Sequence, residues 1–248
     1  MSLKIPSVIG HRGAAAYAPE NTLDSIRTAA DMGAKWVELD VKLTKDFVPI
    51  IFHDDDLDRT TNGHGPVANT NFEDIQDLEA GSWFSESFAG IKIPTLEEAI
   101  DVILHHNLGV NLEIKPCPGR EKDTAEAMLD LLSQIWDDAD RLLLSSFSFV
   151  SLETALDMAP EWARGVLFES DLPENWKDLA QYLEATTINI DGRTVKRETV
   201  EEIIDLEKRV LAYTINDVHL ARRLRSWGVD SFFTDDLETI HDGLFKTH

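Results

Sequence analysis

Short apolar runs alternate along the chain with segments in which apolar residues recur every three or four positions. The short runs predict buried strands, and the longer spacing is typical of amphipathic helices. We expect strands at 8–11, 36–43, 109–114, 142–145, 164–167, 187–190, 210–213 and 231–234. Helical patterns fill the gaps, among them 22–32, 96–106, 123–135, 150–158, 199–208 and 218–227. Strand–helix alternation favours parallel strands, and about eight such units predict a closed α/β barrel of the TIM type, (β/α)8.

One more strand-like run, "PIIFH" at 49–53, does not fit that count. Only a few residues separate it from the strand at 36–43, whereas a parallel crossover needs a dozen or more. We therefore expect it to return antiparallel to that strand, with a turn near Lys45 and Asp46, which brings His53 beside Asp40. The following residues, about 54–93, form an insertion rich in turn signals, with one short helix expected at 72–80.

A composition of 43% hydrophobic and 8% aromatic residues is typical of a globular protein, and the length fits either two small domains or one α/β barrel. The unbroken strand–helix alternation, with no linker, predicts a single domain over residues 1–248. Aspartate and glutamate total 46 against 23 lysines and arginines, a net charge of −23. This excess argues against nucleic acid and anionic membrane as partners, because both attract basic surfaces. No apolar stretch is long enough for a membrane span or a secretion leader, so we expect a cytoplasmic protein without stable membrane insertion. The lone Cys117 rules out an internal disulfide.

Acidic residues occur inside two of the predicted strands. Residues two apart in a strand share a face, so Glu38 and Asp40 point the same way, as do Glu113 and Lys115. Carboxylates that face a barrel interior are costly unless they are paired or bind a metal. An all-oxygen set formed by Glu38, Asp40 and Glu113 suits Mg²⁺, Ca²⁺ or Mn²⁺ rather than Zn²⁺, which prefers histidine or cysteine ligands, and we expect one such ion, with Mg²⁺ as the first choice. The competing interpretation is a group of salt bridges to the nearby cations Arg12, Lys42 and Lys115.

Two histidines and two permanent cations accompany these acids. His11 follows the first strand and His53 ends the hairpin return, so both reach the same mouth of the barrel, where a pair of imidazoles can act as acid and base. Arg12 and Lys115 supply positive charge for phosphate oxygens. The other six histidines lack such placement. Later strand ends carry further candidates for the walls of the site, namely Ser145, Ser146, Phe147, Asn189, Asp191 and Tyr213.

The motifs "GHRG…PENT", "ELDVKLTKD", "PIIFHDDDLDRTTNG", "IPTLEEAI" and "LEIK" together resemble the glycerophosphodiester phosphodiesterase family, in order and spacing. "AYTIN" and "GVDSFFTD" extend the resemblance over nearly the whole chain. It implies a TIM-type barrel with an insertion after the hairpin strand and one divalent metal. It also implies hydrolysis of glycerophosphodiesters, such as glycerophosphocholine and glycerophosphoethanolamine, to sn-glycerol 3-phosphate and an alcohol. The length resembles that of the cytoplasmic bacterial type.

Carried onto this sequence, the resemblance implies metal ligands at Glu38, Asp40 and Glu113. It implies an acid–base pair formed by His11 and His53, and substrate binding by Arg12 and Lys115. Two positions depart from the family pattern: Tyr213 stands where a tryptophan is frequent, and Ser231 where a second glycine is frequent. Tyr213 is therefore expected to shape the wall for the glycerol or the head group, so these departures bear on specificity.

Three other functions are compatible with the pattern. A phospholipase-like enzyme on the same barrel would cut intact or lysophospholipids, and it would need an apolar docking surface. A catalytically silent barrel would bind a phosphorylated ligand without turnover, although here no ligand or histidine is missing. A glycosidase could use Glu38 and Glu113, but it would leave Arg12 and the paired histidines unexplained. The oligomeric state is left open by the sequence.

Overall fold

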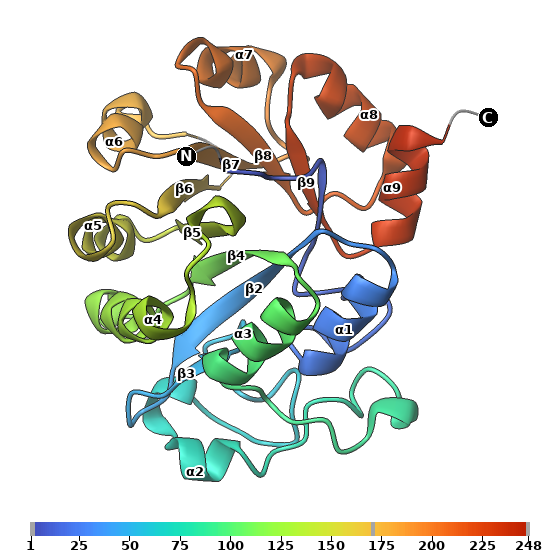
Figure 1. The fold of residues 1–248 in the computed structure, drawn as a ribbon, viewed down its shortest axis with the longest axis vertical. Coiled ribbons are helices and arrows are strands. Elements are labelled where there is room, and N and C mark those ends of the chain that lie inside the picture. The colour runs from blue at the N-terminus through green and yellow to red at the C-terminus, as the bar shows by residue number, and fades with distance from the viewer. Residues whose placement is uncertain (1–2, 170–171, 247–248) are drawn as a thin grey trace.

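The computed structural model describes residues 3–169 and 172–246, and over these ranges it forms a closed parallel β-barrel with one additional antiparallel strand (Figure 1). The barrel strands are β1 (Val8–Gly10), β2 (Trp36–Leu43), β4 (Gly109–Ile114), β5 (Leu142–Ser146), β6 (Ala163–Phe168), β7 (Thr187–Asp191), β8 (Arg209–Tyr213) and β9 (Ser231–Thr234). They pair in the order β1-β9-β8-β7-β6-β5-β4-β2, and a Gly10–Val37 pairing between β1 and β2 closes the ring. The predicted TIM-type barrel is confirmed.

Helices surround this ring on its outer side (Figure 1). They are α1 (Leu23–Asp31), α3 (Leu96–His105), α4 (Glu121–Ile135), α5 (Phe149–Met158), α6 (Trp176–Tyr182), α7 (Arg197–Asp205), α8 (Val218–Trp227) and α9 (Leu237–Phe245). Thr22 and Thr95 begin α1 and α3 with capping boxes, in which the threonine side chain accepts the backbone N–H three residues on. Gly228 ends α8 with φ +105°, a left-handed conformation that glycine adopts without strain. No helix in the described ranges is long and apolar enough to cross a bilayer.

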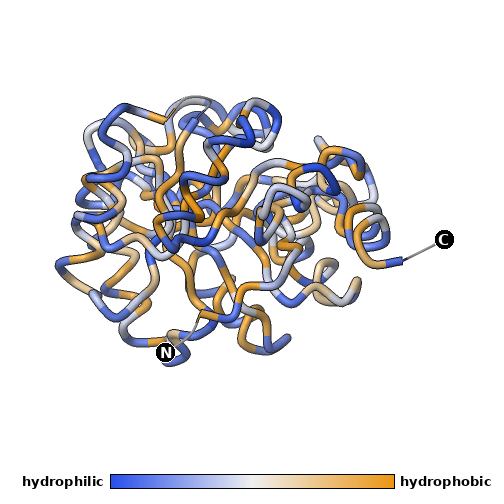
Figure 2. Tube along the Cα trace, turned by 90° about the horizontal axis from the view of Figure 1, so that it is seen from above, coloured by the Kyte–Doolittle hydropathy of each residue, from blue (hydrophilic) through white to orange (hydrophobic). Residues whose placement is uncertain are grey.

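The alternation within β2 shows how the strands divide their side chains between two environments. Val37, Leu39 and Val41 point outward and join the large apolar core between the barrel and its helices. Trp36 points inward, into a small cluster at the N-terminal end of the barrel. Hydrophobic and hydrophilic positions accordingly alternate over short distances along the trace (Figure 2). The polar inward positions of β2 must therefore lie further along, near the C-terminal mouth.

The extra strand β3 (Pro49–Ile51) runs antiparallel to β2, with Val41 opposite Ile51. The backbone N–H of Phe52 continues the pairing to the carbonyl of Asp40, so His53 emerges beside Asp40 as the crossover length predicts. The segment between β3 and α3 has an apolar cluster of its own, formed by Ile50, Phe52, Leu57, Val67, Ile75, Ala80, Ile93 and Cys117. It contains α2 (Phe72–Ile75) and the 3₁₀ turns η1 (Val67–Asn69) and η2 (Glu86–Phe88), and η3 (Ala139–Arg141) precedes β5.

Several expected elements change in extent. The helix expected at 72–80 ends at Ile75 and continues as a turn, in which Leu78 donates its backbone N–H to the Ile75 carbonyl. The backbone N–H groups of Glu79 and Ala80 bond outside any helix, to the Asn62 side chain and the Ile91 carbonyl. The sequence analysis did not single out α6 and α9. β1 ends at Gly10, one residue before His11, and β3 ends at Ile51, so both histidines lie on loops just beyond their strands.

Candidate active site

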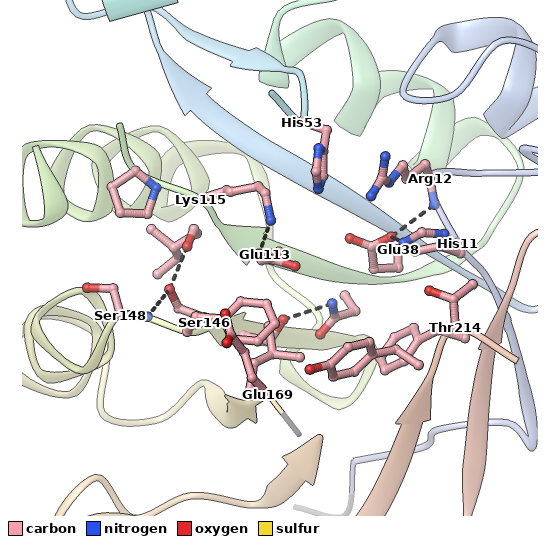
Figure 3. Close-up of a pocket in the computed structure, with 18 of the residues that line it drawn as sticks. His11, Arg12, Glu38, His53, Glu113, Lys115, Ser146, Ser148, Glu169 and Thr214 are labelled. Atoms are coloured by element: carbon pink, nitrogen blue, oxygen red, sulfur yellow. Dashed lines mark hydrogen bonds and ion pairs between the residues drawn. The ribbon is translucent and has the colours of Figure 1, made fainter. Parts of the chain in front are cut away.

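A cavity of about 820 Å³ opens at the C-terminal ends of the barrel strands. Side chains from β2, β4, β5 and β8 line it, together with residues from the loops after β1 and β3. Figure 3 shows His11, Arg12, Glu38, His53, Glu113 and Lys115 converging in this cavity. The structure therefore brings together predicted site residues from four separate segments of the chain.

Three carboxylates meet at this cavity, and two of them, Glu38 and Glu113, line it. One oxygen from each of Glu38, Asp40 and Glu113 lies within 4.8 Å of the other two, and all three residues are buried. β2 presents Glu38 and Asp40 on its inner face, and β4 aligns Glu113 directly opposite Asp40. Asn21 holds Asp40 in place, with its amide donating to Oδ2 at 2.8 Å.

The charges of this cluster are only partly compensated by the protein. Burial and the neighbouring Asp40 raise the pKa of Glu38 to about 8. Burial and Asp40 likewise raise the pKa of Glu113, whereas Arg12 and Lys115 outweigh burial and lower the pKa of Asp40. Glu38 Oε1 is buried without a hydrogen-bond partner. Three hard oxygen donors with one unsatisfied atom fit a divalent cation, which would relieve their mutual repulsion.

Each of the two histidines is held through Nδ1 by a carboxylate. His11 Nδ1 lies 2.7 Å from Asp235 Oδ1, and His53 Nδ1 lies 2.6 Å from Asp54 Oδ1. Such a contact fixes the ring orientation and leaves Nε2 for proton transfer. His11 Nε2 lies 3.9 Å from Glu38 Oε2.

The two imidazoles differ in their surroundings. Burial lowers the pKa of His11, but the hydrogen bond to Asp235 and the charge of Glu38 outweigh it, so the net shift is upward. Burial lowers the pKa of His53, and the positive charges of Arg12 and Lys115 add to that effect. Environments that separate the pKa values of two neighbouring groups suit a pair in which one donates a proton and the other accepts one.

Arg12 is positioned by its backbone as well as by its side chain. Its φ of +51° is unusual for a residue with a side chain, and its N–H donates to Glu38 Oε2 at 2.9 Å. The guanidinium turns back over the acids, with Nη1 2.6 Å from Glu20 Oε1 and Nε 3.4 Å from Asp40 Oδ2. The next residue, Gly13, has φ +86°, and a Cβ there would lie 2.4 Å from the hydroxyl of Ser25. The "HRG" sequence thus allows the close turn that aims Arg12 at the acidic cluster.

Lys115 is the second cation that contacts the acidic cluster. Its Nζ donates to Glu113 Oε1 at 2.8 Å and lies 3.8 Å from Asp40 Oδ1. These two negative charges outweigh burial and raise the pKa of Lys115, so its ammonium is retained. Lys42, named as an alternative partner of the acids, instead donates to Asp55 at 2.6 Å.

A chain of ion pairs holds His53 and Arg12 in place, and the sequence analysis missed it. Arg59 binds Asp54 with two nitrogens, at 2.6 and 2.9 Å, and binds Glu20 with two, at 2.9 and 2.7 Å. Asp54 holds His53, and Glu20 holds Arg12. The cluster of aspartates followed by an arginine in "HDDDLDR" was a visible signal, but a run of surface charges has the same appearance.

The weaker candidates divide into two groups. Ser145, Ser146, Phe147 and Tyr213 line the cavity, and the Tyr213 hydroxyl donates to the Phe168 carbonyl at 2.6 Å. Asn189 is buried in the barrel, and Asp191 instead accepts hydrogen bonds from Arg193. Among the remaining histidines, those at 64, 105, 106, 219 and 241 do not line this cavity, and His248 lies outside the described residues.

Comparison with known proteins adds a family relationship to this geometry. A sequence profile described as the glycerophosphoryl diester phosphodiesterase family matches residues 11–239. A glycerophosphodiester phosphodiesterase from Caldanaerobacter subterraneus subsp. tengcongensis is 36% identical over 237 residues, which cover 94% of this chain and 95% of that protein. One from Bacillus subtilis is 33% identical over 248 residues, covering 94% of this chain and 84% of that protein. The solved structure of an Oleispira antarctica phosphodiesterase in complex with its product sn-glycerol 3-phosphate is 40% identical, with a TM-score of 0.94 and 97% of each chain covered.

Proposed function

Because this chain belongs to the glycerophosphoryl diester phosphodiesterase family, we propose that its barrel site hydrolyses glycerophosphodiesters to sn-glycerol 3-phosphate and an alcohol. The observation that carries this proposal is the meeting of three buried carboxylates with two carboxylate-held imidazoles in one cavity. The product named for the Oleispira antarctica structure supports the choice of substrate class.

In this proposal the phosphodiester binds between the fixed cations and the acidic cluster. The Arg12 guanidinium and the Lys115 ammonium bind its non-bridging oxygens, where they offset negative charge as it develops in the transition state. Glu38, Asp40 and Glu113 would hold one divalent cation, which when bound supplies Lewis-acid stabilisation of the phosphoryl oxygens. All three donors are hard carboxylate oxygens, which suit Mg²⁺, Ca²⁺ or Mn²⁺, and Mg²⁺ is the ion proposed first.

His11 and His53 move the protons at Nε2. One imidazole takes the proton of the nucleophile, which is either water or the glycerol 2-hydroxyl of the substrate, and the other donates a proton to the departing alcohol. Asp235 and Asp54 keep both rings oriented through Nδ1. The pair would therefore act without a covalent bond between enzyme and substrate.

Chelation and metal add-back with glycerophosphocholine test this proposal. We expect EDTA-treated protein to be inactive and Mg²⁺ to restore the release of glycerol 3-phosphate and choline in equal amounts. Ca²⁺ and Mn²⁺ should be compared at equal concentration. Release of phosphocholine, or activity that chelation leaves unchanged, would contradict it. Phosphorus NMR during turnover distinguishes the two nucleophiles, since attack by the 2-hydroxyl passes through a cyclic glycerol phosphate.

Two comparisons separate the alternatives. Hydrolysis of lysophospholipid micelles in preference to soluble diesters would favour the phospholipase-like enzyme, and absence of turnover across several diesters would favour a silent barrel.

Glu38→Gln should lose the response to added metal. Glu201→Gln is the matched control, because Glu201 is an exposed glutamate on α7 paired with Arg197.

We also propose that residues 1–248 form one barrel domain with an insertion at about 54–93. The apolar cluster of the insertion includes Ile50 of β3, which ties the insertion to the barrel sheet. A cytoplasmic location, and the absence of nucleic-acid partners, stay predictions. Cell fractionation and binding assays with DNA and RNA check them.

A further inference from the structure

A second cavity, of about 620 Å³, lies next to His11 and Arg12. Four segments surround it: the loop between β1 and α1, the Trp83–Phe84 part of the insertion, the loop between β8 and α8, and the loop between β9 and α9. His11 and Arg12 line both cavities. In Figure 3 these two residues stand at the end of the first cavity opposite Ser148. A phosphate held by Arg12 would therefore lie where the two cavities meet.

One wall of the second cavity is an aromatic platform. Trp83 is 41% exposed, and its indole N–H is already satisfied by the carbonyl of Ala80 at 2.9 Å. Because its N–H is already bonded, the exposed part of Trp83 can offer a ligand only aromatic surface. Phe84 packs edge-on against Trp83, with ring centroids 5.8 Å apart, and contacts Phe88 in the same way at 5.5 Å.

The backbone around this platform is fixed in advance of any ligand. The carboxylate of Glu79 accepts the backbone N–H groups of Gly81, Ser82 and Gly90. A Cβ at residue 81 would lie 1.9 Å from the Phe88 carbonyl oxygen, so only glycine allows this close approach. Ligand binding on Trp83 would therefore require little ordering of the loop.

The lining of this cavity also contains acidic residues. Glu20, Asp235 and Asp236 all line it, and the pKa of each is lowered by its neighbours, so all three are charged near neutral pH. Glu20 is already paired with Arg12 and Arg59, and Asp235 holds His11, whereas Asp236 has no ion pair among the described residues. Asp236 is fixed by the Tyr17 hydroxyl, which donates to it at 2.5 Å. An aromatic face together with carboxylates is the chemistry that recognises ammonium and quaternary ammonium groups.

The first cavity also contains aromatic rings and carboxylates, but there Lys115 Nζ already lies 5.6 Å from the centroid of the Phe147 ring. Asn111, Ser148 and Thr214 line it with amide and hydroxyl groups that can hydrogen-bond a polyol. Displacement at phosphorus places the attacking oxygen and the departing alcohol oxygen roughly in line, and the glycerol ester oxygen that stays on phosphorus lies to the side of that axis. The two ester arms of a bound diester therefore leave phosphorus in different directions. Two cavities that meet at Arg12 match two such arms.

We propose that the second cavity is the subsite for the alcohol arm and that it selects substrates with a cationic head group, an amino alcohol such as choline or ethanolamine. The assignment rests on the proposed hydrolysis of glycerophosphodiesters. It places the glycerol arm in the first cavity. His11, which lines both cavities, then stands beside the departing alcohol.

The test compares glycerophosphocholine with its neutral isostere, the 3,3-dimethylbutyl ester of glycerol 3-phosphate. The two leaving alcohols, choline and 3,3-dimethylbutanol, have nearly the same shape but differ in acidity, so the two esters need not react equally fast in the wild-type enzyme. The measured quantity is therefore the ratio of kcat/KM for the choline ester to kcat/KM for the neutral ester, compared between each variant and the wild type. We expect Trp83→Leu to reduce the choline-to-neutral ratio by about 3- to 30-fold, mainly through loss of kcat/KM for the choline ester. Tyr182→Leu, which removes an exposed aromatic ring on α6, is the matched control and should leave the ratio unchanged.

An unchanged ratio in a folded Trp83→Leu variant would overturn the inference while leaving the proposed function intact. If that variant fails to fold, Asp236→Asn replaces it, because asparagine can also cap α9 and only the charge is lost. Its ratio should fall in the same direction, and an unchanged ratio would again overturn the inference. Failure of the wild-type enzyme to hydrolyse either ester would instead refute the proposed function and, with it, the subsite.

Discussion

Two histidines, His53 and His64, have the same local hydrogen bond but lie in different environments, and only one of them is a candidate catalytic group. His53 and His64 both contact an aspartate through Nδ1, at 2.6 and 2.8 Å. The side chain of His64 is 83% exposed, whereas that of His53 is 27% exposed and lines the main cavity. The difference lies in burial and in the neighbouring Arg12 and Lys115, which lower the pKa of His53.

This contrast provides a matched pair of variants. We expect His53→Asn to reduce kcat on glycerophosphocholine by about 10²-fold or more, because proton transfer in the transition state is lost. His64→Asn should retain nearly wild-type turnover, since it removes a histidine with the same local hydrogen bond outside the site. Steady-state kinetics at saturating Mg²⁺ measure both. Near-wild-type turnover by a folded His53→Asn variant would exclude the proton-transfer role.

At the scale of elements, the insertion is attached to the barrel through Arg59. This residue joins Asp54, just after β3, to Glu20, in the loop before α1. Those two carboxylates in turn orient His53 and Arg12. The insertion therefore contributes to the arrangement of the site as well as to its wall, even though Arg59 itself is half exposed.

We expect Arg59→Lys to lower kcat by about 10-fold or more with little change in KM, because a lysine cannot hold two carboxylates with a planar fork. Arg141→Lys is the control, since Arg141 also pairs with a carboxylate, Asp138, but lies before β5 at the opposite end of the barrel. Circular dichroism and steady-state kinetics on both variants check this. Equal kcat values for the two variants would show that Arg59 does not position the site.

Because of these ion pairs, we expect the free energy of unfolding of an Arg59 variant to differ from that of wild type by an amount that depends on pH. Hydrogen bonds to Arg59 outweigh burial and lower the pKa values of Glu20 and Asp54 in the folded state. A carboxyl group with a lowered folded pKa stabilises the protein above its unfolded pKa of about 4, and that contribution is lost as the pH falls through the folded value.

Arg59→Gln should therefore lower the free energy of unfolding near pH 7 by about 1 kcal/mol or less per pair, because the pairs are partly exposed to solvent. The difference from wild type should shrink progressively below about pH 4. Urea unfolding of both proteins across this range measures it. A difference that stays constant with pH would mean that the guanidinium acts through packing.

At the scale of the whole molecule, the protein carries a net charge of −23, although the proposed substrate of its site contains an anionic phosphodiester. The positive charges of Arg12 and Lys115 are local, and each already contacts a carboxylate. The long-range field therefore opposes the approach of an anionic diester, while a zwitterion such as glycerophosphocholine has no net charge for it to repel.

Salt should distinguish these two kinds of substrate. We expect kcat/KM for an anionic diester, glycerophosphoglycerol, to rise by about 2-fold or more as added NaCl shortens the Debye length to about 10 Å near 0.1 M. The value for glycerophosphocholine should change much less, and it serves as the control at saturating Mg²⁺. A fall for the anionic substrate would indicate that the local cations dominate its approach.

The sequence by itself determined the strand–helix order, the antiparallel return of residues 49–51 and the shared face of Glu38 and Asp40. These features follow from local periodicity and chain length, because side chains two apart in a strand lie on one face and a short connection cannot make a parallel crossover. The convergence of four strand ends at one mouth followed from the fold class that the same pattern predicts.

Only the tertiary structure decided which groups hold the site residues. His11 is held by Asp235, 224 residues away, and Arg59 reaches Glu20 across 39 residues. The second cavity likewise joins loops from the start, the insertion and the end of the chain. Periodicity encodes which face a residue occupies, but not the path of a loop, so contacts between loops appear only once closure of the barrel has placed them side by side.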